Sequence, residues 1–402
     1  MINLEQPRKY KALVNQAQQV AREIFRPISR KYDQAEHQYP KELDMLAALL
    51  DGMNASGGSG AGAAGLAQSS PDEQAEVRNG SNMNTVLGLT ELCWGDVGLA
   101  LSLPRQGLGN AAIAAVANEE QKRRLDGCWA AMAITEPSCG SDSAAIRTTA
   151  VRDGDDYVIN GEKIFITAGG RCDHIVVWAS LNPKAGRAAI KSFVVPKDSP
   201  GMELVRLDHK LGIRSSDTAT VIFKDCRVPA ENLLGSPDID TKKGFGGVMQ
   251  TFDNTRPVVA AMAVGCARAA LERAAELLEE AGLNNDYATA RWTQTAAISE
   301  LQRLEAEWES ARLLTLRAAW MADNAQPNSL QASMAKAKAG RVATEVTLRC
   351  AEMCGSLGYA EDELLEKWAR DAKILDIFEG TQQIQLLIVA RRVLGLTSSE
   401  LK

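Results

Sequence analysis

The stretch TTAVRDGDDYVINGEKIFITAG, residues 148–169, alternates polar and apolar side chains in short runs that DGDD and NG separate. Short alternating runs bounded by such turn residues are typical of β-hairpins. More β-type runs follow as far as residue 229, among them HIVVWASL, KSFVVPK, MELVRL and TATVIFKDCRVP. The sequence therefore predicts a small all-β domain over residues 130–242, and we expect it to be barrel-like.

Helical patterns flank this β-domain on both sides. Before it, apolar residues between Val14 and Ile24 recur at helical spacing, which predicts an N-terminal helical domain over residues 1–129. Within that domain, residues 51–74 are rich in glycine, alanine and serine and are predicted to be a flexible insert. After the β-domain, four long helical patterns in residues 243–402 predict an antiparallel four-helix bundle. The predicted fold class is therefore α+β with three domains.

Two of the C-terminal patterns carry specific boundary predictions. FDNTRP, residues 252–257, is expected to precede a long helix, so that Arg256 and Pro257 stand at its start. The last pattern, KWARDAKILDIFEGTQQIQLLIVARRVLG, is expected to form one closing helix.

Composition excludes several classes of protein. The 402 residues carry a formal net charge of −6, which disfavours a nucleic-acid binder or a protein of anionic membrane surfaces. The 8 cysteines form no CxxC pair, which favours reduced thiols in the cytosol, and the 3 histidines lie far apart in sequence, so no metal site is predicted. The first residues contain no apolar core run, so no signal peptide is expected, and no apolar run approaches membrane-spanning length. We therefore expect a cytoplasmic protein with no membrane insertion.

The segment IFEGTQQIQ, residues 377–385, offers a candidate base. Glu379 follows Ile377 and Phe378, and a carboxylate among apolar side chains has a raised pKa, which makes it a better base. The alternative is an ordinary acid favoured by the dipole of a helix N-terminus.

Three other segments suggest ligand contacts. ITEPSCGSD, residues 134–142, combines small residues and hydroxyls that let backbone amides approach an anionic or carbonyl-rich ligand. Phe165 and Thr167 lie two apart and would share one face of a strand, which suits a ring with a hydrogen-bonding nitrogen. Arg256 can hold a ligand oxygen. The alternatives are a domain-boundary turn, a core phenylalanine and a solvated arginine.

Together, these segments resemble the acyl-CoA dehydrogenase family. AITEPSCGSDSAA, residues 133–145, and EMCGSLGYAEDELLEKWARD, residues 352–371, are similar to its two signatures. NGEKIFITAGG, FDNTRPVVAAMAVG and RDAKILDIFEGTQQIQLLIVAR resemble further family segments, and the similarity runs from about Glu91 to Leu394.

The resemblance implies FAD as the cofactor and assigns roles to residues. It implies that Glu379 removes the α-proton of an acyl-CoA, and Thr255, at the position where some members carry the base, cannot serve. It implies substrate contacts for Phe252, Asp253, Arg256 and Gly380. The flavin contacts that it implies are Ile134, Thr135, Gly140, Ser141, Phe165, Thr167, Thr381 and Gln383.

The implied reaction is α,β-dehydrogenation of the thioester to a trans-2-enoyl-CoA, as in lipid β-oxidation. The carbonyl would be bound by the Glu379 N–H and by the flavin ribityl chain. Reduced FAD would pass its electrons to an electron-transfer flavoprotein.

Some family motifs are altered. The RKTFG-like stretch that reaches the FAD of a neighbouring subunit is replaced by AGLNNDYATARWTQTAAIS, a second such motif carries Glu352, and a YGG-like segment is missing. We therefore expect an oligomer, and specifically a heteromer of α2β2 type with a related subunit. The alternatives are a non-catalytic partner subunit, an acyl-CoA oxidase, or an acyl-carrier-protein dehydrogenase on the same scaffold.

Overall fold

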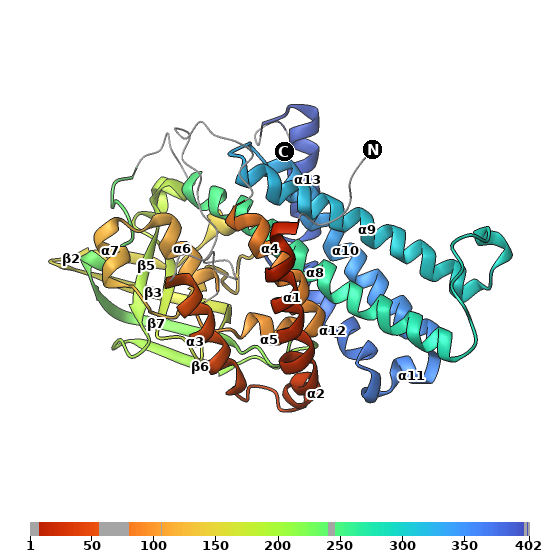
Figure 1. The fold of residues 1–402 in the computed structure, drawn as a ribbon. Helices are drawn as coiled ribbons and strands as arrows, with labels where there is room; N and C mark the ends of the chain where they lie inside the picture. The colour runs from red at the N-terminus through yellow and green to blue at the C-terminus, as the bar shows by residue number, and fades with distance from the viewer. Residues whose placement is uncertain (1–7, 56–79, 106, 240–245, 398–399, 401–402) are drawn as a thin grey trace.

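The computed structural model describes residues 8–55, 80–105, 107–239, 246–397 and 400, with the backbone alone for residues 49–55 and 246–254. A helical N-terminal part, a curled sheet and a helical C-terminal part follow one another along the chain, which confirms the predicted fold class. In Figure 1 the sheet lies on the left, the C-terminal helices on the right, and the N-terminal helices in front of both. Among these described residues, no helix combines the length and apolarity needed to cross a bilayer.

The N-terminal part consists of short and medium helices. They are η1 (Arg8–Tyr10), α1 (Lys11–Val20), the π-helix η2 (Ala21–Phe25), α2 (Arg26–Gln34), α3 (Glu42–Ala55), α4 (Ser81–Gly95), α5 (Val97–Leu101), α6 (Leu108–Val116) and α7 (Glu119–Arg124). Residues 51–55 of the predicted flexible insert belong to helix α3, and the rest of that insert lies outside the described residues. The helical pattern of the preceding residues, ELDMLAALL, extends into the start of the insert.

The middle part is a seven-stranded mixed sheet with strand order β1-β4-β2-β3-β7-β6, and β5 pairs with β4. The strands are β1 (Ala130–Ala133), β2 (Thr149–Asp153), β3 (Asp156–Thr167), β4 (His174–Ser180), β5 (Ile190–Pro196), β6 (Met202–Leu207) and β7 (Thr218–Pro229). Short 3-10 turns lie between or after them: η4 (Ser143–Ala145), η5 (Pro183–Ala189) and η6 (Ala230–Asn232). The sheet has its own apolar core, which includes Ile159, Val177 and Phe193.

The two predicted turns within residues 148–169, at Gly154 and at Gly161, have different roles. Gly154, with φ +65°, turns the chain between the antiparallel strands β2 and β3, as predicted. The prediction of a second turn at Asn160 and Gly161 is wrong, because both residues lie inside β3. The register with β7 shifts at this point, and a Cβ on Gly161 would stand 2.4 Å from Thr148 Oγ1. Here glycine allows a β-bulge to pack closely against the neighbouring chain.

The C-terminal part contains the long helices α8 (Gly246–Glu280), α9 (Ala296–Asp323) and α10 (Ser329–Met353). The shorter elements are η7 (Arg291–Thr293), α11 (Gly355–Tyr359), η8 (Glu361–Glu363), α12 (Leu365–Leu375) and α13 (Gln382–Leu394). Two boundary predictions are wrong. Helix α8 begins ten residues before Arg256 and continues through Pro257, and the expected closing helix is two helices, α12 and α13, separated by a break that contains Glu379.

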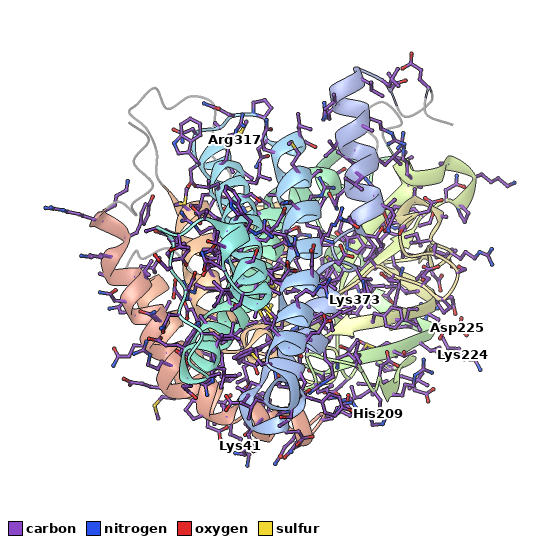
Figure 2. All side chains as sticks on the ribbon, turned by 90° about the vertical axis from the view of Figure 1, so that its right-hand side faces the viewer. Lys41, His209, Lys224, Asp225, Arg317 and Lys373 are labelled. Atoms are coloured by element: carbon purple, nitrogen blue, oxygen red, sulfur yellow. The ribbon has the colours of Figure 1, made fainter. Side chains whose placement is uncertain are left out.

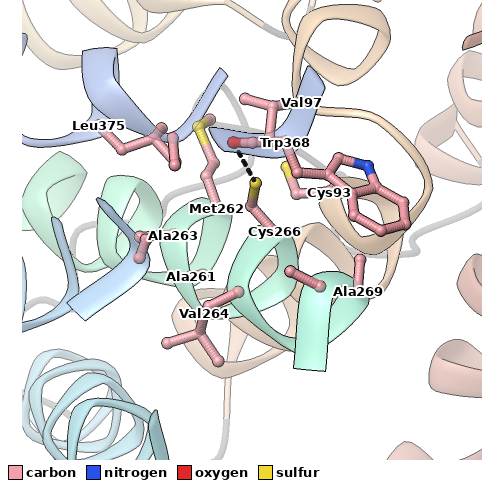
Figure 3. Close-up of a cluster of buried hydrophobic side chains, with 14 of the residues drawn as sticks. Cys93, Val97, Ala261, Met262, Ala263, Val264, Cys266, Ala269, Trp368 and Leu375 are labelled. Carbon is pink, nitrogen blue, oxygen red and sulfur yellow. Dashed lines mark hydrogen bonds between the residues drawn. The ribbon is translucent and has the colours of Figure 1, made fainter. Parts of the chain in front are cut away.

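The N- and C-terminal helices share one hydrophobic core, which spans residues from Phe25 on η2 to Leu375 on α12. Figure 3 shows part of it, where Val97, Met262 and Trp368 pack together and the Cys266 thiol donates a 3.8 Å hydrogen bond to the Trp368 carbonyl. Alanine and glycine on α8 allow close packing: a Cβ on Gly265 would stand 2.2 Å from the Thr90 carbonyl. All eight cysteines are free thiols, and six are buried.

A buried ionic network ties the three parts together. Lys367 Nζ lies 2.7 Å from Asp96 Oδ2 and also donates to Asp371. Asp371 accepts from the Ile213 amide of the middle part, and Asp96 accepts from the Ser29 hydroxyl of α2. The network thus joins the segment after β6 to side chains from α2, from the α4–α5 junction and from α12.

Candidate active site

The break between α12 and α13 presents Glu379. Helix α12 ends as the amides of Ile377 and Phe378 turn back to the Ile374 carbonyl. Glu379 and Gly380 then adopt consecutive left-handed conformations, with φ values of 57° and 87°. A left-handed backbone is costly for glutamate, and such strain is found at functional sites where the surrounding structure holds it.

The residues after the break hold it in place. The Thr381 hydroxyl caps α13 by accepting from the Ile384 amide. The side-chain amide of Gln385, one turn into the helix, donates to the carbonyls of Glu379 and Gly380 at 3.1 and 3.2 Å. A Cβ on Gly380 would stand 2.5 Å from Gln385 Nε2, so this position requires glycine both for its φ and for space.

Three groups act on the Glu379 carboxylate. Burial raises the pKa of Glu379, while the hydrogen bond from Thr255 and the positive charges of Arg256 and Lys336 oppose that rise. The Thr255 hydroxyl donates to Glu379 Oε2 over 2.9 Å. Residue 255 thus carries no base, and its hydroxyl orients the carboxylate and stabilises its charged form.

Lys336 on α10 supports the break from beneath. Its side chain is fully buried, and its ammonium donates a 2.7 Å hydrogen bond to the Gly380 carbonyl. Burial lowers the pKa of Lys336 to about 8, while the charges of Asp376 and Glu379 oppose the shift. None of the described carboxylates forms an ion pair with this lysine within 4.0 Å.

Glu379 faces a cavity of about 300 Å³ formed by all three parts of the chain. Helices α4 and α5 contribute apolar side chains such as Leu89 and Leu101, and α8 contributes Val259 and Met262. The sheet contributes one wall, and α13 contributes Ile384, Gln385 and Ile388. The lining is mainly apolar with a few polar groups, which is the usual character of a pocket for an organic ligand.

A buried ion pair positions the sheet wall. Lys163 on β3 is fully buried, and its ammonium contacts Glu136 Oε1 at 2.7 Å and the Ile134 carbonyl at 3.1 Å. Glu136 also accepts from the amides of Arg147 and Thr148. The segment 134–148 is therefore fixed beside β3, so that small residues and hydroxyls line the cavity.

Most of the residues predicted for the site come together in this cavity. Phe165 lines it in a left-handed conformation with φ 58° and is 63% exposed. A register shift between Lys163 and Ile166, rather than regular strand alternation, brings Phe165 and Thr167 to the same cavity. The predicted residues that line the cavity are Ile134, Thr135, Gly140, Ser141, Phe165, Thr167, Arg256, Glu379 and Gly380.

Two predicted residues, Thr381 and Gln383, are not among the described residues that line it. Thr381 caps α13, and Gln383 is exposed on the same helix. The side chains of Phe252 and Asp253 lie outside the described residues, although both positions belong to α8.

Sequence reasoning missed Lys336 and Gln385. Gln385 lies two residues after the predicted Gln383 and is fully buried, and its Oε1 has no hydrogen-bond partner among the described residues. The hydroxyl of Thr381 is a typical helix N-cap, and a helix that begins there has Gln385 one turn after the cap, on the same side of the helix. The sequence therefore held a signal for Gln385 in the cap position. Lys336 gives no comparable signal within the alanine-rich pattern SMAKAKAG.

The donor set fits a flavin. A flat ring with a polar edge needs an aromatic or aliphatic surface beside hydroxyls and amides, and Phe165, Ile134, Thr135 and Thr167 line one cavity with that combination. Gly140 and Ser141 line the same cavity, and a Cβ on Gly140 would meet nothing closer than 3.7 Å, at Thr135 Cγ2, so the backbone there leaves room for a ligand group.

The chain matches two family models. The model described as acyl-CoA dehydrogenase, middle domain, matches residues 131–226, and that described as acyl-CoA dehydrogenase, C-terminal domain, matches residues 242–394. The rat mitochondrial short-chain specific acyl-CoA dehydrogenase is 39% identical over 275 residues, which cover 67% of this chain and 63% of that protein. The match thus spans less than two thirds of this curated relative's length.

Solved structures match over nearly the whole chain. Butyryl-CoA dehydrogenase from Megasphaera elsdenii superposes with a TM-score of 0.83 and 29% identity, covering 98% of this chain and 100% of that one. A chain solved in work on the electron transferring flavoprotein of Acidaminococcus fermentans gives a TM-score of 0.83 and 30% identity, with the same coverage.

Proposed function

This chain belongs to the acyl-CoA dehydrogenase family, whose cofactor is FAD, and we propose that it catalyses α,β-dehydrogenation of an acyl-CoA thioester with Glu379 as the base. The observation that carries this proposal is the Glu379 carboxylate itself. It stands on a strained helix break at the cavity, and burial raises its pKa. A carboxylate taken out of water is the stronger base that abstraction of a weakly acidic α-proton requires.

The chain's own residues have separate tasks in this reaction. Glu379 takes the α-proton, and Thr255 holds the carboxylate toward one orientation through its 2.9 Å hydrogen bond. Among the described residues, no backbone carbonyl accepts from the Glu379 N–H, so this donor is available for the thioester carbonyl, whose polarisation acidifies the α-carbon. Apolar residues of α4, α5 and α8 exclude water from the acyl chain. Bound FAD supplies the acceptor for the β-hydride.

The experiment that tests this function is anaerobic titration of the FAD-loaded chain with acyl-CoA substrates, for the wild type and for Glu379→Gln. We expect the flavin absorbance of the wild type to bleach, and the turnover of the variant to fall by at least about 10³-fold with FAD retained, because an amide cannot take the proton. Unchanged turnover in Glu379→Gln would instead support a non-catalytic partner subunit. Rapid reoxidation of the reduced flavin by oxygen would indicate an acyl-CoA oxidase.

We further propose a short-chain acyl-CoA as the substrate. Two similar proteins are named for short-chain and butyryl substrates, and Met262 and Leu103 add bulk to the apolar lining of a cavity of about 300 Å³. The same titration with acyl chains of increasing length tests this proposal. We expect kcat/KM to be highest for short chains, whereas a maximum for long chains would contradict it.

We also propose that the chain works beside a related subunit, in an assembly of α2β2 type. Arg291 lies in the α8–α9 connection, which protrudes on the right of Figure 1, and this arginine donates to the Ser299 hydroxyl and carbonyl at 2.9 Å. Trp292 beside it is 87% exposed, and Tyr359 at the end of α11 is also 87% exposed. Exposed aromatic side chains of this kind are typical of surfaces that another protein covers.

The assembly state can be measured directly. Purification of this chain alone as a homotetramer with one FAD per chain and full activity would refute the heteromer. We expect instead that a co-expressed related chain raises both FAD content and activity. We also propose that the reduced FAD of this chain passes its electrons to an electron-transfer flavoprotein, and that the protein is cytoplasmic.

A further inference from the structure

Two of the protein's three histidines meet on a surface away from the cavity. His37 follows helix α2, and His209 follows strand β6. Their ring centroids lie 5.0 Å apart, with the rings tilted by 53°. Figure 2 shows His209 at the edge of the molecule, and its side chain is 83% exposed.

Glu36 joins the pair. Its Oε2 lies 2.7 Å from His209 Nδ1, and its Oε1 accepts a 2.8 Å hydrogen bond from the Lys210 amide. One carboxylate oxygen of Glu36 and one ring nitrogen from each histidine all lie within 4.8 Å of one another. We call these three residues the Glu36 cluster.

His37 is the least satisfied member of the Glu36 cluster. Both of its ring nitrogens are buried without a hydrogen-bond partner among the described residues, and its φ is +69°. A buried polar atom without a partner and a left-handed non-glycine residue both cost free energy. The loop is nevertheless held in this form, because Arg171 donates to the carbonyls of His37 and Gln38.

The neighbouring cations have acceptors of their own. The Lys210 ammonium donates to the Ser216 carbonyl at 2.7 Å, and Arg171 pairs with Asp217 at 3.3 Å. Neither positive charge is therefore bound to the Glu36 carboxylate, which remains able to serve as a ligand.

We propose that the Glu36 cluster binds a divalent transition-metal ion of the zinc class. Two imidazole nitrogens and a carboxylate oxygen are a common donor set for such an ion, and solvent beside His209 can complete a tetrahedral site. With metal–nitrogen bonds of about 2.0 Å, two imidazoles on one tetrahedral ion have ring centroids roughly 5 Å apart, which agrees with the observed spacing.

Binding requires only a local adjustment. The ligand atoms all lie within 4.8 Å of one another, and any pair farther apart than about 3.3 Å, the edge of a tetrahedron with bonds of about 2.0 Å, must approach to that distance. His209 is exposed and can move toward His37, and it exchanges its hydrogen bond to Glu36 for a shared ion. The ion would cross-link the end of α2 to the segment after β6, and so stabilise the contact between the N-terminal helices and the sheet.

The test is calorimetric titration of the FAD-loaded full chain with ZnCl₂ after dialysis against a chelator, together with thermal unfolding with and without the ion. We expect one zinc ion per chain and a rise of Tm on binding. His209→Ala and Glu36→Gln should each weaken the affinity at least tenfold and remove the rise of Tm, while catalytic activity without zinc stays unchanged because neither residue lines the cavity.

Two controls make the result decisive. His174→Gln changes the remaining histidine, at the start of β4, and should leave the affinity unchanged. Titration with MgCl₂ should give no binding, because magnesium prefers an all-oxygen site. Absence of saturable zinc binding, or an equal affinity in wild type and His209→Ala, would overturn the proposal and would assign any bound zinc to the free thiols.

Discussion

Lys367 and Lys336 are both fully buried, yet their surroundings differ completely. At the junction of the three parts, Asp96 and Asp371 flank Lys367, and although burial disfavours its charge, the two carboxylates hold its pKa above the usual range. In the active site, Lys336 contacts a carbonyl oxygen, and burial lowers its pKa to about 8.

The surroundings of the two lysines show that a buried charge can serve either to hold parts of the fold together or to take part in chemistry. The junction network is mutually compensated and resists change, because removing any member leaves a buried charge unpaired. The active-site group is only partly compensated, so burial lowers the pKa of Lys336 and raises that of Glu379, in each case toward the neutral form. Incomplete compensation lowers stability and is expected where a charge is needed for chemistry.

The largest effect on this contrast is expected from Lys367→Met. Loss of the ammonium leaves Asp96 and Asp371 buried side by side, and we expect the free energy of unfolding to fall by about 3–5 kcal/mol. Denaturant unfolding of the FAD-loaded chain measures it. Lys373→Met on the same helix is the matched control, since this exposed lysine, labelled in Figure 2, should change stability by no more than about 0.5 kcal/mol. An equal loss in both variants would contradict the distinction.

Lys336→Met should have the opposite sign. A pKa lowered from 10.5 to about 8 means that keeping Lys336 charged at neutral pH destabilises the folded wild type by on the order of 3 kcal/mol. The variant removes this cost but also loses the hydrogen bond of the ammonium, which is worth about 1 kcal/mol. We therefore expect a gain of about 2 kcal/mol in unfolding free energy at pH 7, together with lower activity.

The pH dependence of the same variant sharpens this test. Between pH 8 and 10.5 the unfolded chain binds more protons at Lys336 than the folded chain does, so the stability of the wild type should rise with pH relative to the variant. The advantage of Lys336→Met should thus shrink across that window. Lys338→Met, which removes a surface ion pair with Glu307, should show no such pH-dependent difference.

The smallest effect is expected from Thr255→Val. The variant removes the hydroxyl that stabilises the charged form of Glu379, so the pKa of the carboxyl should rise further. Because the base is active only when deprotonated, the acidic limb of the kcat/KM profile should move to higher pH, with a loss of about 1 kcal/mol, or several-fold, at neutral pH. Thr255→Ser keeps the hydroxyl and should retain the wild-type profile. A profile unchanged in the valine variant would show that the hydroxyl has no part in tuning the base.

The three-part order and the family were predictable because they rest on patterns that extend over tens of residues. The alternation of polar and apolar residues in 148–169, and the helical spacing of apolar residues elsewhere, remain recognisable even where single residues depart from the pattern. The segment around Glu379 was identifiable by its motif, but its conformation was not. Apolar spacing continues on both sides of residues 376–381, so the sequence shows one helix where the backbone makes two.

What escaped prediction depends on contacts between distant segments. Lys336 is an ordinary helix-forming residue, and only packing against the α12–α13 break shows that it is buried. His37 and His209 are 172 residues apart, and their separation argued against a metal site until the loops after α2 and β6 were seen to meet. The start of α8 was misplaced because Pro257 is tolerated inside a helix that packs against α4, α9 and α10.

The junction network also bears on the order in which the chain folds. Lys367 and Asp96 are 271 residues apart, and Asp371 and Ile213 are 158 apart. Contacts that close such long loops gain nothing until each part has largely formed and docked, so they are expected late, after the main folding barrier. Changes at Lys367 should therefore accelerate unfolding far more than they slow folding. The network would then determine how long the native molecule persists rather than how quickly it is reached.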